Sequence, residues 1–260
     1  MQIGLIGGIG PAATDFYYRS LIERFASEEK NLDMTIVHAD APTLIKNLME
    51  NNKDGQVAIY NDLTLRLKKA GANFVAITSI AGHFCIEKFK EKSVLPVVDL
   101  LSCVQKEIKH RGYKRIGIIG TKPVMVSKFY SMITSAEVFI PEDNLLDKVH
   151  EAYAEMATLG RANNEQKKIF EKACNQFLSK NKVDAVMLGG TDLALIYRSD
   201  NVDFKLIDCA KIHVEELFRL HVNWIFILLI FIWFIFFKMK IDPFKISYPK
   251  QRIVEIKEKV

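Results

Sequence analysis

Short apolar runs alternate with longer amphipathic stretches along most of this chain. The runs lie at residues 3–7, 34–38, 74–78, 95–98, 115–120, near 138, at 185–188 and at 205–207. Continuous apolar runs of this length are typical of strands buried in parallel sheets. Helical spacing of apolar residues predicts helices at 14–27, 53–70, 127–135, 147–177 and 209–220, and one that follows the fourth strand and ends at 109. A polar turn is expected at 39–43 after the second strand. Alternating strands and helices predict parallel sheets covered by helices on both faces.

The same plan occurs twice. The segment GLIGGIGPAATDFYY from Gly4 is similar to GIIGTKPVMVSKFY from Gly117, and the Phe-Tyr pair falls 12 residues after that glycine in both. Further on, ANFVAITS (72–79) is similar to VDAVMLGG (183–190), and PVVD (96–99) is similar to KLID (205–208). Three landmarks in the same order indicate a duplication.

The duplication predicts an α/β fold of two Rossmann-like parallel-sheet half-domains, related by a pseudo-two-fold axis, with an active-site cleft between them. We assign residues 1–100 to the N-terminal half, with the final helix 208–221 packing back on it, and residues 101–207 to the second half. Residues 222–260 hold a hydrophobic segment and a basic C-terminal tail.

Composition and charge describe an ordinary globular protein. The chain has 260 residues, 26% of them charged, and a net charge of +5. The last 23 residues alone carry seven Lys or Arg against three acids, so the rest is nearly neutral and does not indicate nucleic-acid binding. The four cysteines show neither CxxC pairing nor metal-like spacing with the histidines, so we expect no disulfide framework and no metal site. No signal peptide precedes the first strand, which favours a cytoplasmic location.

One segment departs from this pattern. Residues 224–237 read WIFILLIFIWFIFF, fourteen apolar residues followed by Lys238 and Lys240. As a helix this run rises about 21 Å, short of the roughly 30 Å hydrocarbon core of a bilayer. Its tryptophans and the lysines after it fit a membrane interface. Membrane association through this segment, packing on a partner or core, and an aberrant C-terminus remain open alternatives.

Ligands of parallel α/β sheets bind beyond the carboxyl ends of the strands, so we sought chemistry there. The glycine-rich turn after the first strand contains Gly8, Gly10, Pro11 and Thr14. It lacks the GxGxxG spacing and the P-loop lysine of nucleotide sites. Its amides and the helix that follows favour a carboxylate ligand, with a simple tight turn as the alternative. After the second strand, His38 and Asp40 are placed to line the cleft.

The third strand of each half is followed by residues that could transfer a proton or bind a substrate carboxylate. These are Thr78, Ser79, His83 and Cys85 in the first half, and Gly189, Gly190, Thr191 and Asp192 in the second. Four of them also have a structural interpretation: helix capping for His83, Thr191 and Asp192, and burial as a small apolar residue for Cys85.

Two motifs carry a resemblance to a known family. GLIGGIGP with Ala13-Thr14, and VDAVMLGGTDLALI, resemble the N-terminal and second catalytic motifs of the aspartate/glutamate racemase family, over about residues 1–220. The resemblance implies the duplicated fold, a homodimer, a small amino-acid or dicarboxylate substrate, and racemisation without pyridoxal phosphate or another cofactor. It also implies two cysteines that move the Cα proton on opposite faces of the substrate. Those positions fall at Ser79 and Gly190, so neither thiol is present.

We therefore predict a cofactor-independent, racemase-like isomerase that acts on aspartate, glutamate or a similar small carboxylate. The catalytic candidates are Ser79, Thr78, His83, Cys85 and Thr191. The substrate-binding candidates are Gly8, Gly10, Pro11, Thr14, His38, Asp40, Gly189, Gly190 and Asp192. Because both thiols are missing, a catalytically degenerate ligand-binding homologue and a one-sided, decarboxylase-like proton-transfer enzyme remain alternatives.

Overall fold

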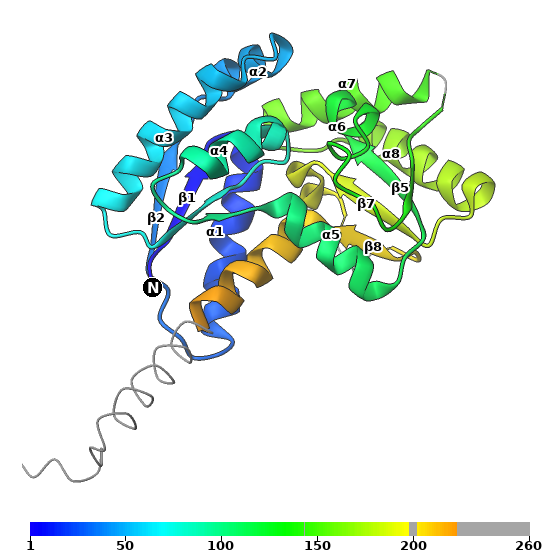
Figure 1. Ribbon diagram of the computed structural model, residues 1–260. Coiled ribbons are helices and arrows are strands. Elements are labelled where there is room, and N and C mark those ends of the chain that lie inside the picture. Colours follow the sequence, from blue (N-terminus) through cyan, green and yellow to red (C-terminus); the bar gives the residue numbers. More distant parts are fainter. Residues whose placement is uncertain (143, 198–201, 223–260) are drawn as a thin grey trace, which may run out of the picture. The chain divides into compact units, whose positions relative to one another are not determined.

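Two four-stranded sheets of parallel strands form the centre of the described residues (Figure 1). The computed structural model describes residues 1–142, 144–197 and 202–222. The first sheet has the order β2-β1-β3-β4, and its strands are β1 (Ile3–Gly7), β2 (Met34–His38), β3 (Phe74–Ile77) and β4 (Val97–Val98). The second has the order β6-β5-β7-β8, and its strands are β5 (Arg115–Gly120), β6 (Glu137–Phe139), β7 (Ala185–Gly189) and β8 (Leu206–Asp208). Both sheets repeat one topology, which confirms the predicted duplicated α/β fold.

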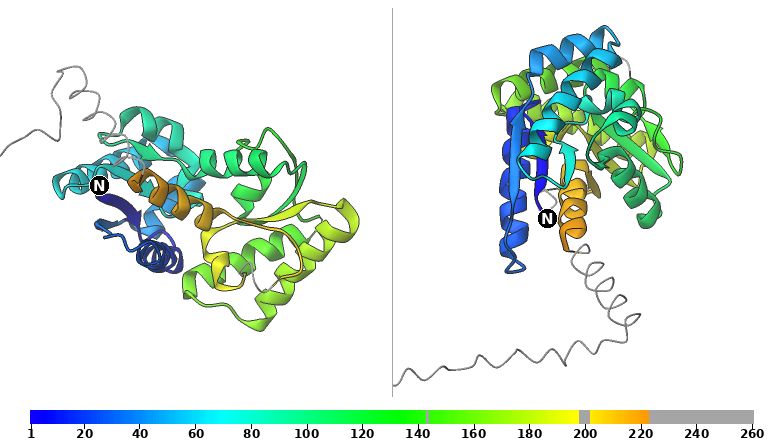
Figure 2. Two further views of the ribbon diagram at one scale, coloured as in Figure 1. Left: turned by 90° about the horizontal axis from the view of Figure 1, so that it is seen from below. Right: turned by 60° about the vertical axis from the view of Figure 1, so that its left-hand side comes forward.

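Helices cover both sheets (Figure 2). In the first half they are α1 (Pro11–Ala26), α2 (Ala41–Met49), α3 (Lys53–Lys69), the 3₁₀ helix η1 (Ala81–Cys85) and α4 (Ile86–Lys92), followed by α5 (Leu100–Arg111). In the second half they are α6 (Lys122–Val126), α7 (Leu145–Leu159), α8 (Asn164–Gln176), the π-helical turn η2 (Phe177–Asn181) and the 3₁₀ helix η3 (Thr191–Leu195). A last described helix begins at residue 209.

Three helical predictions were wrong. The turn expected at 39–43 begins α2, because Asp40 accepts a hydrogen bond from the Thr43 amide and Pro42 fits the first turn. The helix expected at 127–135 is absent there; α6 lies earlier, and residues 128–131 have φ between 49° and 61°. The helix expected at 147–177 divides at Gly160, where φ is 63°, and a capping box of Asn163 and Gln166 begins α8.

The helices α5 and the last described helix each contact the half to which the sequence assigned them. In α5, the Gln105 side chain donates to the Thr134 hydroxyl at 2.9 Å, and Arg111 donates to the Leu206 carbonyl oxygen, both in the second half. The last described helix packs back beside α1, where Phe218 makes an edge contact with Phe25 (Figures 1 and 2). Residues Met1–Leu220 form one compact unit, and the boundaries expected within it at residues 100 and 207 stay predictions.

A buried histidine joins the last described helix to the first sheet. Nε2 of His213 lies 3.0 Å from the Val98 carbonyl oxygen, which can only accept, so this nitrogen carries the proton. Nδ1 therefore accepts from the Tyr17 hydroxyl at 2.8 Å. Burial lowers the pKa of His213 to about 3, so the imidazole is neutral and both of its nitrogens are used.

None of the helices within the described residues is long and apolar enough to cross a membrane. The hydrophobic segment 224–237 lies outside the described residues.

Replacing Tyr17 by Phe tests the packing of the last described helix. Tyr17→Phe leaves the buried Nδ1 of His213 without its donor, so we expect the free energy of unfolding to fall by about 1–3 kcal/mol. Urea denaturation followed by circular dichroism measures the change. Tyr18→Phe is the matched control, because Tyr18 is 46% exposed on the same helix and should change stability by less than about 0.5 kcal/mol. Equal losses in the two variants would contradict the assignment.

Candidate active site

Three predicted residues meet where β1 and β3 end. Thr14, in the first turn of α1, accepts a hydrogen bond from the Gly8 amide at 2.9 Å through Oγ1. The same oxygen lies 3.3 Å from Oγ1 of Thr78, whose side chain is fully buried. Two hydroxyls and a glycine turn are thereby fixed at one end of the first sheet, as expected for parallel strands.

The turn itself requires glycine. Gly8 and Gly10 have φ of 91° and 85°, a region that residues with a side chain rarely adopt. A Cβ on Gly8 would lie 2.4 Å from Nδ1 of His38, so the exposed His38 packs directly over the turn. Pro11 follows at the start of α1, where its missing N–H leaves no hydrogen bond unmade.

Asp192 reaches the N-terminus of α1 from the other half of the chain. Its Oδ1 accepts from the Ala13 amide at 3.1 Å, and its Oδ2 accepts from the Tyr153 hydroxyl at 2.8 Å. Burial raises the pKa of this carboxyl, while the two donors act in the opposite direction. The sequence predicted a ligand's carboxylate at this helix N-terminus. A carboxylate of the chain itself lies there, and it caps α1 instead of its own helix.

Tyr153 occupies the space beside Gly190, the position expected for the second thiol. A Cβ on Gly190 would lie 2.1 Å from Cε2 of Tyr153 and 2.6 Å from its hydroxyl oxygen, so no side chain fits there while Tyr153 remains. Burial and the charge of Asp192 raise the pKa of Tyr153 far above its usual value of about 10. Tyr153 is not among the predicted site residues, because it is one of several residues on the buried face of α7.

Ser79 lies at the position expected for the first thiol, and His83, four residues later, has a buried ring nitrogen without a hydrogen-bond partner among the described residues. Oγ of Ser79 accepts from the Gly82 amide at 3.4 Å, and the residue is 6% exposed. Nδ1 of His83 lies 2.7 Å from the Ser79 carbonyl oxygen and therefore carries the proton. Nε2 is then a bare acceptor, buried and without a hydrogen-bond partner among the described residues. Burial lowers the pKa of His83, although Asp99 opposes this, so the imidazole is neutral.

The remaining predicted residues have structural surroundings. Cys85 is 2% exposed and burial raises its pKa to about 12, so a protonated thiol disfavours the predicted catalytic role. Asp40 caps α2, and hydrogen bonds from Thr43 lower its pKa. Gly189 packs against β5, where an added Cβ would lie 2.8 Å from Ile118. Thr191 is buried at the start of η3.

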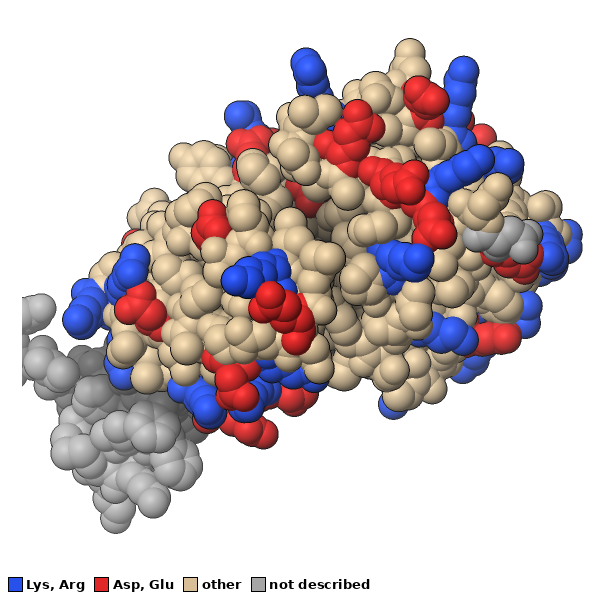
Figure 3. All heavy atoms as spheres, turned by 90° about the horizontal axis from the view of Figure 1, so that it is seen from above, with Lys and Arg blue, Asp and Glu red and all other residues tan. Residues whose placement is uncertain are grey.

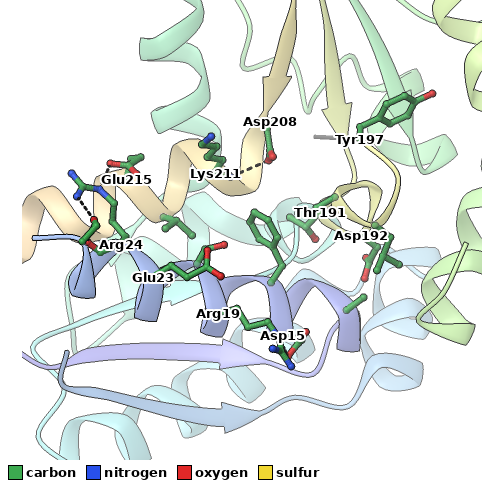
Figure 4. A pocket seen from close by; sticks show the side chains of 17 residues that line it. Asp15, Arg19, Glu23, Arg24, Thr191, Asp192, Tyr197, Asp208, Lys211 and Glu215 are labelled. Carbon is green, nitrogen blue, oxygen red and sulfur yellow. Dashed lines mark hydrogen bonds and ion pairs between the residues drawn. The ribbon is translucent and has the colours of Figure 1, made fainter. Parts of the chain in front are cut away.

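A charged cavity of about 710 Å³ lies between α1, η3 and the start of the last described helix (Figure 4). Thr191 and Asp192 are the predicted site residues that line it. Its other charged lining residues are Asp15, Arg19, Glu23, Arg24, Asp208, Lys211 and Glu215. No sequence pattern indicates this cavity, because isolated charges along an amphipathic helix are also typical of an ordinary solvated face. Basic and acidic side chains are also interspersed over the face shown in Figure 3.

The chain is similar to known amino-acid racemases in sequence and in fold. A family model described as Asp/Glu/Hydantoin racemase matches residues 6–217. A broad specificity amino-acid racemase of Bacillus subtilis (strain 168) is 23% identical over 138 residues, which make up 51% of this chain and only 60% of that relative. The crystal structure of an aspartate racemase homologue from Pyrococcus horikoshii OT3 is 24% identical, with a TM-score of 0.72, over 84% of this chain and 98% of that one. Picrophilus torridus aspartate racemase is 17% identical, with a TM-score of 0.64, over 80% of this chain and 89% of that one. These structural similarities show the fold.

The buried carboxyl of Asp192 makes stability depend on pH. Because its native pKa is raised, the native state holds this proton more tightly than the unfolded state, whose carboxyl titrates near 3.9. Its contribution to stability is complete below about pH 3.9 and is lost as pH rises through the native pKa. We expect Asp192→Asn to remove this loss, so the stability of wild type relative to the variant should fall as pH rises from about 4 to 7. Urea denaturation at several pH values measures it.

Asp184→Asn is a control of opposite sign. Backbone amides of Lys114 and Arg115 donate to Asp184 and lower its pKa. The stability that Asp184 contributes is present above about pH 3.9 and is lost as pH falls through the lowered native pKa. Parallel pH profiles for the two variants would contradict the assignment of Asp192.

Proposed function

This chain belongs to the Asp/Glu/hydantoin racemase family, and we propose that it is an isomerase of the amino-acid racemase type that works without pyridoxal phosphate. Its substrate in this proposal is aspartate, glutamate or a similar small carboxylate. The site lies where β1 and β3 end, beside the glycine turn and the hydroxyls of Thr14 and Thr78.

The observation that carries the proposal is the pairing of a polar anchor with a neutral imidazole on one sheet. The Gly8 turn, Thr14 and Thr78 form a hydrogen-bonded polar cluster at the ends of β1 and β3, beside the N-terminus of α1, and a helix N-terminus suits a carboxylate. On the same sheet, Ser79 and His83 follow β3 directly. His83 is neutral and its Nε2 has no hydrogen-bond partner among the described residues, so it has the lone pair that a general base needs.

The chemistry is proton transfer at Cα of the bound amino acid. A base removes the proton, the C–H bond breaks, and its electron pair is delocalised toward the adjacent carboxylate. A proton that has exchanged with solvent then forms a new C–H bond. His83, acting directly or through the Ser79 hydroxyl, is the candidate base. A hydroxyl alone is a weak base and needs such a neighbour.

A catalytically degenerate binder of the same ligands is the second candidate. Both expected thiols are replaced, which favours this candidate. Position 79 is a serine, and position 190 is a glycine with Tyr153 beside it. A one-sided, decarboxylase-like reaction is a further alternative on the same evidence. Homodimer formation, a cytoplasmic location and membrane contact through 224–237 stay predictions.

Deuterium exchange at Cα tests the proposal. The full chain is incubated in D₂O with L- and D-aspartate and L- and D-glutamate, and loss of the Cα proton is followed by NMR. We expect exchange above the buffer rate, and a reduction of about 100-fold or more in Ser79→Ala and in His83→Gln, since general bases contribute about 10²–10⁴-fold. Circular dichroism verifies that each variant is folded.

Ser20→Ala is the matched control, because Ser20 lines the charged cavity instead of the strand ends. Its exchange rate should stay within about twofold of wild type. Loss of exchange in Ser20→Ala with full activity in Ser79→Ala would move the site into the cavity. Absence of exchange, with calorimetric binding of one of these amino acids, would favour the degenerate binder.

A further inference from the structure

We propose that the charged cavity between α1, η3 and the last described helix is a second ligand site, and that it binds a linear organic polycation of the polyamine class. Its volume of about 710 Å³ is in the range of small-molecule sites. The residues of the proposed active site do not line it, neither Thr14 and Thr78 nor Ser79 and His83. The inference therefore stands apart from the proposed function.

The cavity is elongated along α1. The residues of this helix that line it recur every three or four positions and so lie on one face, as Ala12, Phe16, Ser20, Glu23 and Ser27 show. At a rise of about 1.5 Å per residue, the first and last of them are roughly 22 Å apart. A cavity of this length suits a chain-like ligand better than a compact one.

A buried hydroxyl in the wall of the cavity has no partner. Thr191, at the start of η3, is 3% exposed and lines the cavity (Figure 4). Its hydroxyl has no hydrogen-bond partner among the described residues. A polar group in a buried position is costly to leave unsatisfied. An ammonium group of a ligand has three donors, and one of them can satisfy this oxygen.

The carboxylate of Asp208 lines the same end of the cavity as Thr191. Asp208 ends β8, which pairs with β7, and Thr191 follows the end of β7. Asp208 accepts from the Lys211 amide at 3.0 Å, and no cationic side chain pairs with it among the described residues. Burial raises the pKa of Asp208, although that amide acts in the opposite direction. A ligand ammonium beside Asp208 would stabilise its charged form.

The two arginines of the cavity are already paired with carboxylates of its own wall. Nε of Arg19 lies 2.9 Å from both carboxylate oxygens of Asp15. Nε of Arg24 lies 2.9 Å from Glu215, and Nη1 of Arg24 lies 3.0 Å from Glu28 outside the cavity. A ligand anion would have to compete with these carboxylates for each guanidinium, so the arginines do not favour an anion.

The charges that remain favour a cation. Glu23 projects from α1 toward the last described helix and has neither a hydrogen bond nor an ion pair among the described residues (Figure 4). Asp192 is set aside, because both of its oxygens already have donors. Glu23 and Asp208 are then opposed only by the exposed Lys211. Two separate carboxylates along one cavity match a ligand with more than one ammonium group.

Apolar side chains complete the wall. Phe16, Leu195 and Val214 line the cavity, so the methylene segments of a polyamine can pack against them. The aromatic ring of Phe16 can also attract a nearby ammonium group. The chain as a whole has a net charge of +5 and repels a polycation at long range. Binding of a polyamine therefore requires a local site of this kind.

Isothermal titration calorimetry with spermidine tests the proposal. The full chain at low ionic strength should bind spermidine saturably at one site, and added salt should weaken the binding. 1-Aminobutane, which has only one ammonium group, should bind about tenfold more weakly or worse. Citrate, a polyanion, is the charge-reversed probe. Absence of spermidine binding, or tighter binding of citrate than of spermidine, would overturn the inference.

A matched pair of substitutions tests the unpartnered hydroxyl. Thr191→Val removes the hydroxyl and keeps the shape, so the dissociation constant of spermidine should rise by about tenfold or more, as expected for a hydrogen bond to a charged group. Thr191→Ser keeps the hydroxyl and should stay within about threefold of wild type. Equal affinities of the Val and Ser variants would contradict the role of this hydroxyl and overturn the inference.

Asp208→Asn tests the carboxylate. Asparagine still caps a helix, so the variant should fold, which circular dichroism verifies, while the dissociation constant of spermidine should rise by about tenfold or more. Asp62→Asn is the control, because Asp62 is an exposed carboxylate of α3 that pairs with Arg66 and does not line the cavity. Its affinity should stay within about twofold of wild type. Unchanged affinity in Asp208→Asn would place any binding outside the cavity. None of these measurements depends on racemase activity, so failure of the proposed function leaves their outcome unaffected.

Discussion

The buried carboxylate of Asp192 is the interaction on which the candidate site depends. Removing a carboxylate from water costs several kcal/mol unless donors replace the lost hydration. Here the Ala13 amide at the N-terminus of α1 and the Tyr153 hydroxyl provide those donors, one from each half of the chain. The partial positive charge of the helix N-terminus adds to the compensation. The position of η3 against α1, and of the phenol against Gly190, both follow from this one group.

The duplication preserves backbone order but not the side chains where the strands end. Both sheets place the first strand of the half between the second and the third, so equivalent ends lie at equivalent edges. In the first half these ends offer the hydroxyls of Thr14 and Thr78. In the second half, Tyr153 fills the space beside Gly190 after β7, and its hydroxyl donates a hydrogen bond to Asp192. The repeated topology therefore gives the two halves equivalent strand ends, while the side chains at those ends differ between the halves.

The parts of the fold that the sequence revealed are those encoded by local patterns. Met34–His38 and Arg115–Gly120 agree with the predicted strands, because each apolar run is bounded by polar residues. The segment at 39–43 misled because Asp followed by Ala-Pro can open either a turn or a helix. The left-handed run at 128–131 contains no glycine to indicate it. The pairing of Tyr153 with Asp192 spans 39 positions, and that of Asp192 with Ala13 spans 179, so no local pattern could reveal either.

The packing of Tyr153 against Gly190 is hard to alter one residue at a time. A side chain added at Gly190 clashes with the phenol, which must then move out of a buried, hydrogen-bonded position. Removing the phenol alone leaves a cavity, at a cost of about 3–5 kcal/mol for a large aromatic side chain, and takes one donor from Asp192. Each single step is destabilising, whereas the joint change exchanges one filled space for another. Gly190 and Tyr153 therefore form one structural unit, and the absence of a side chain at position 190 is tied to the packing of α7.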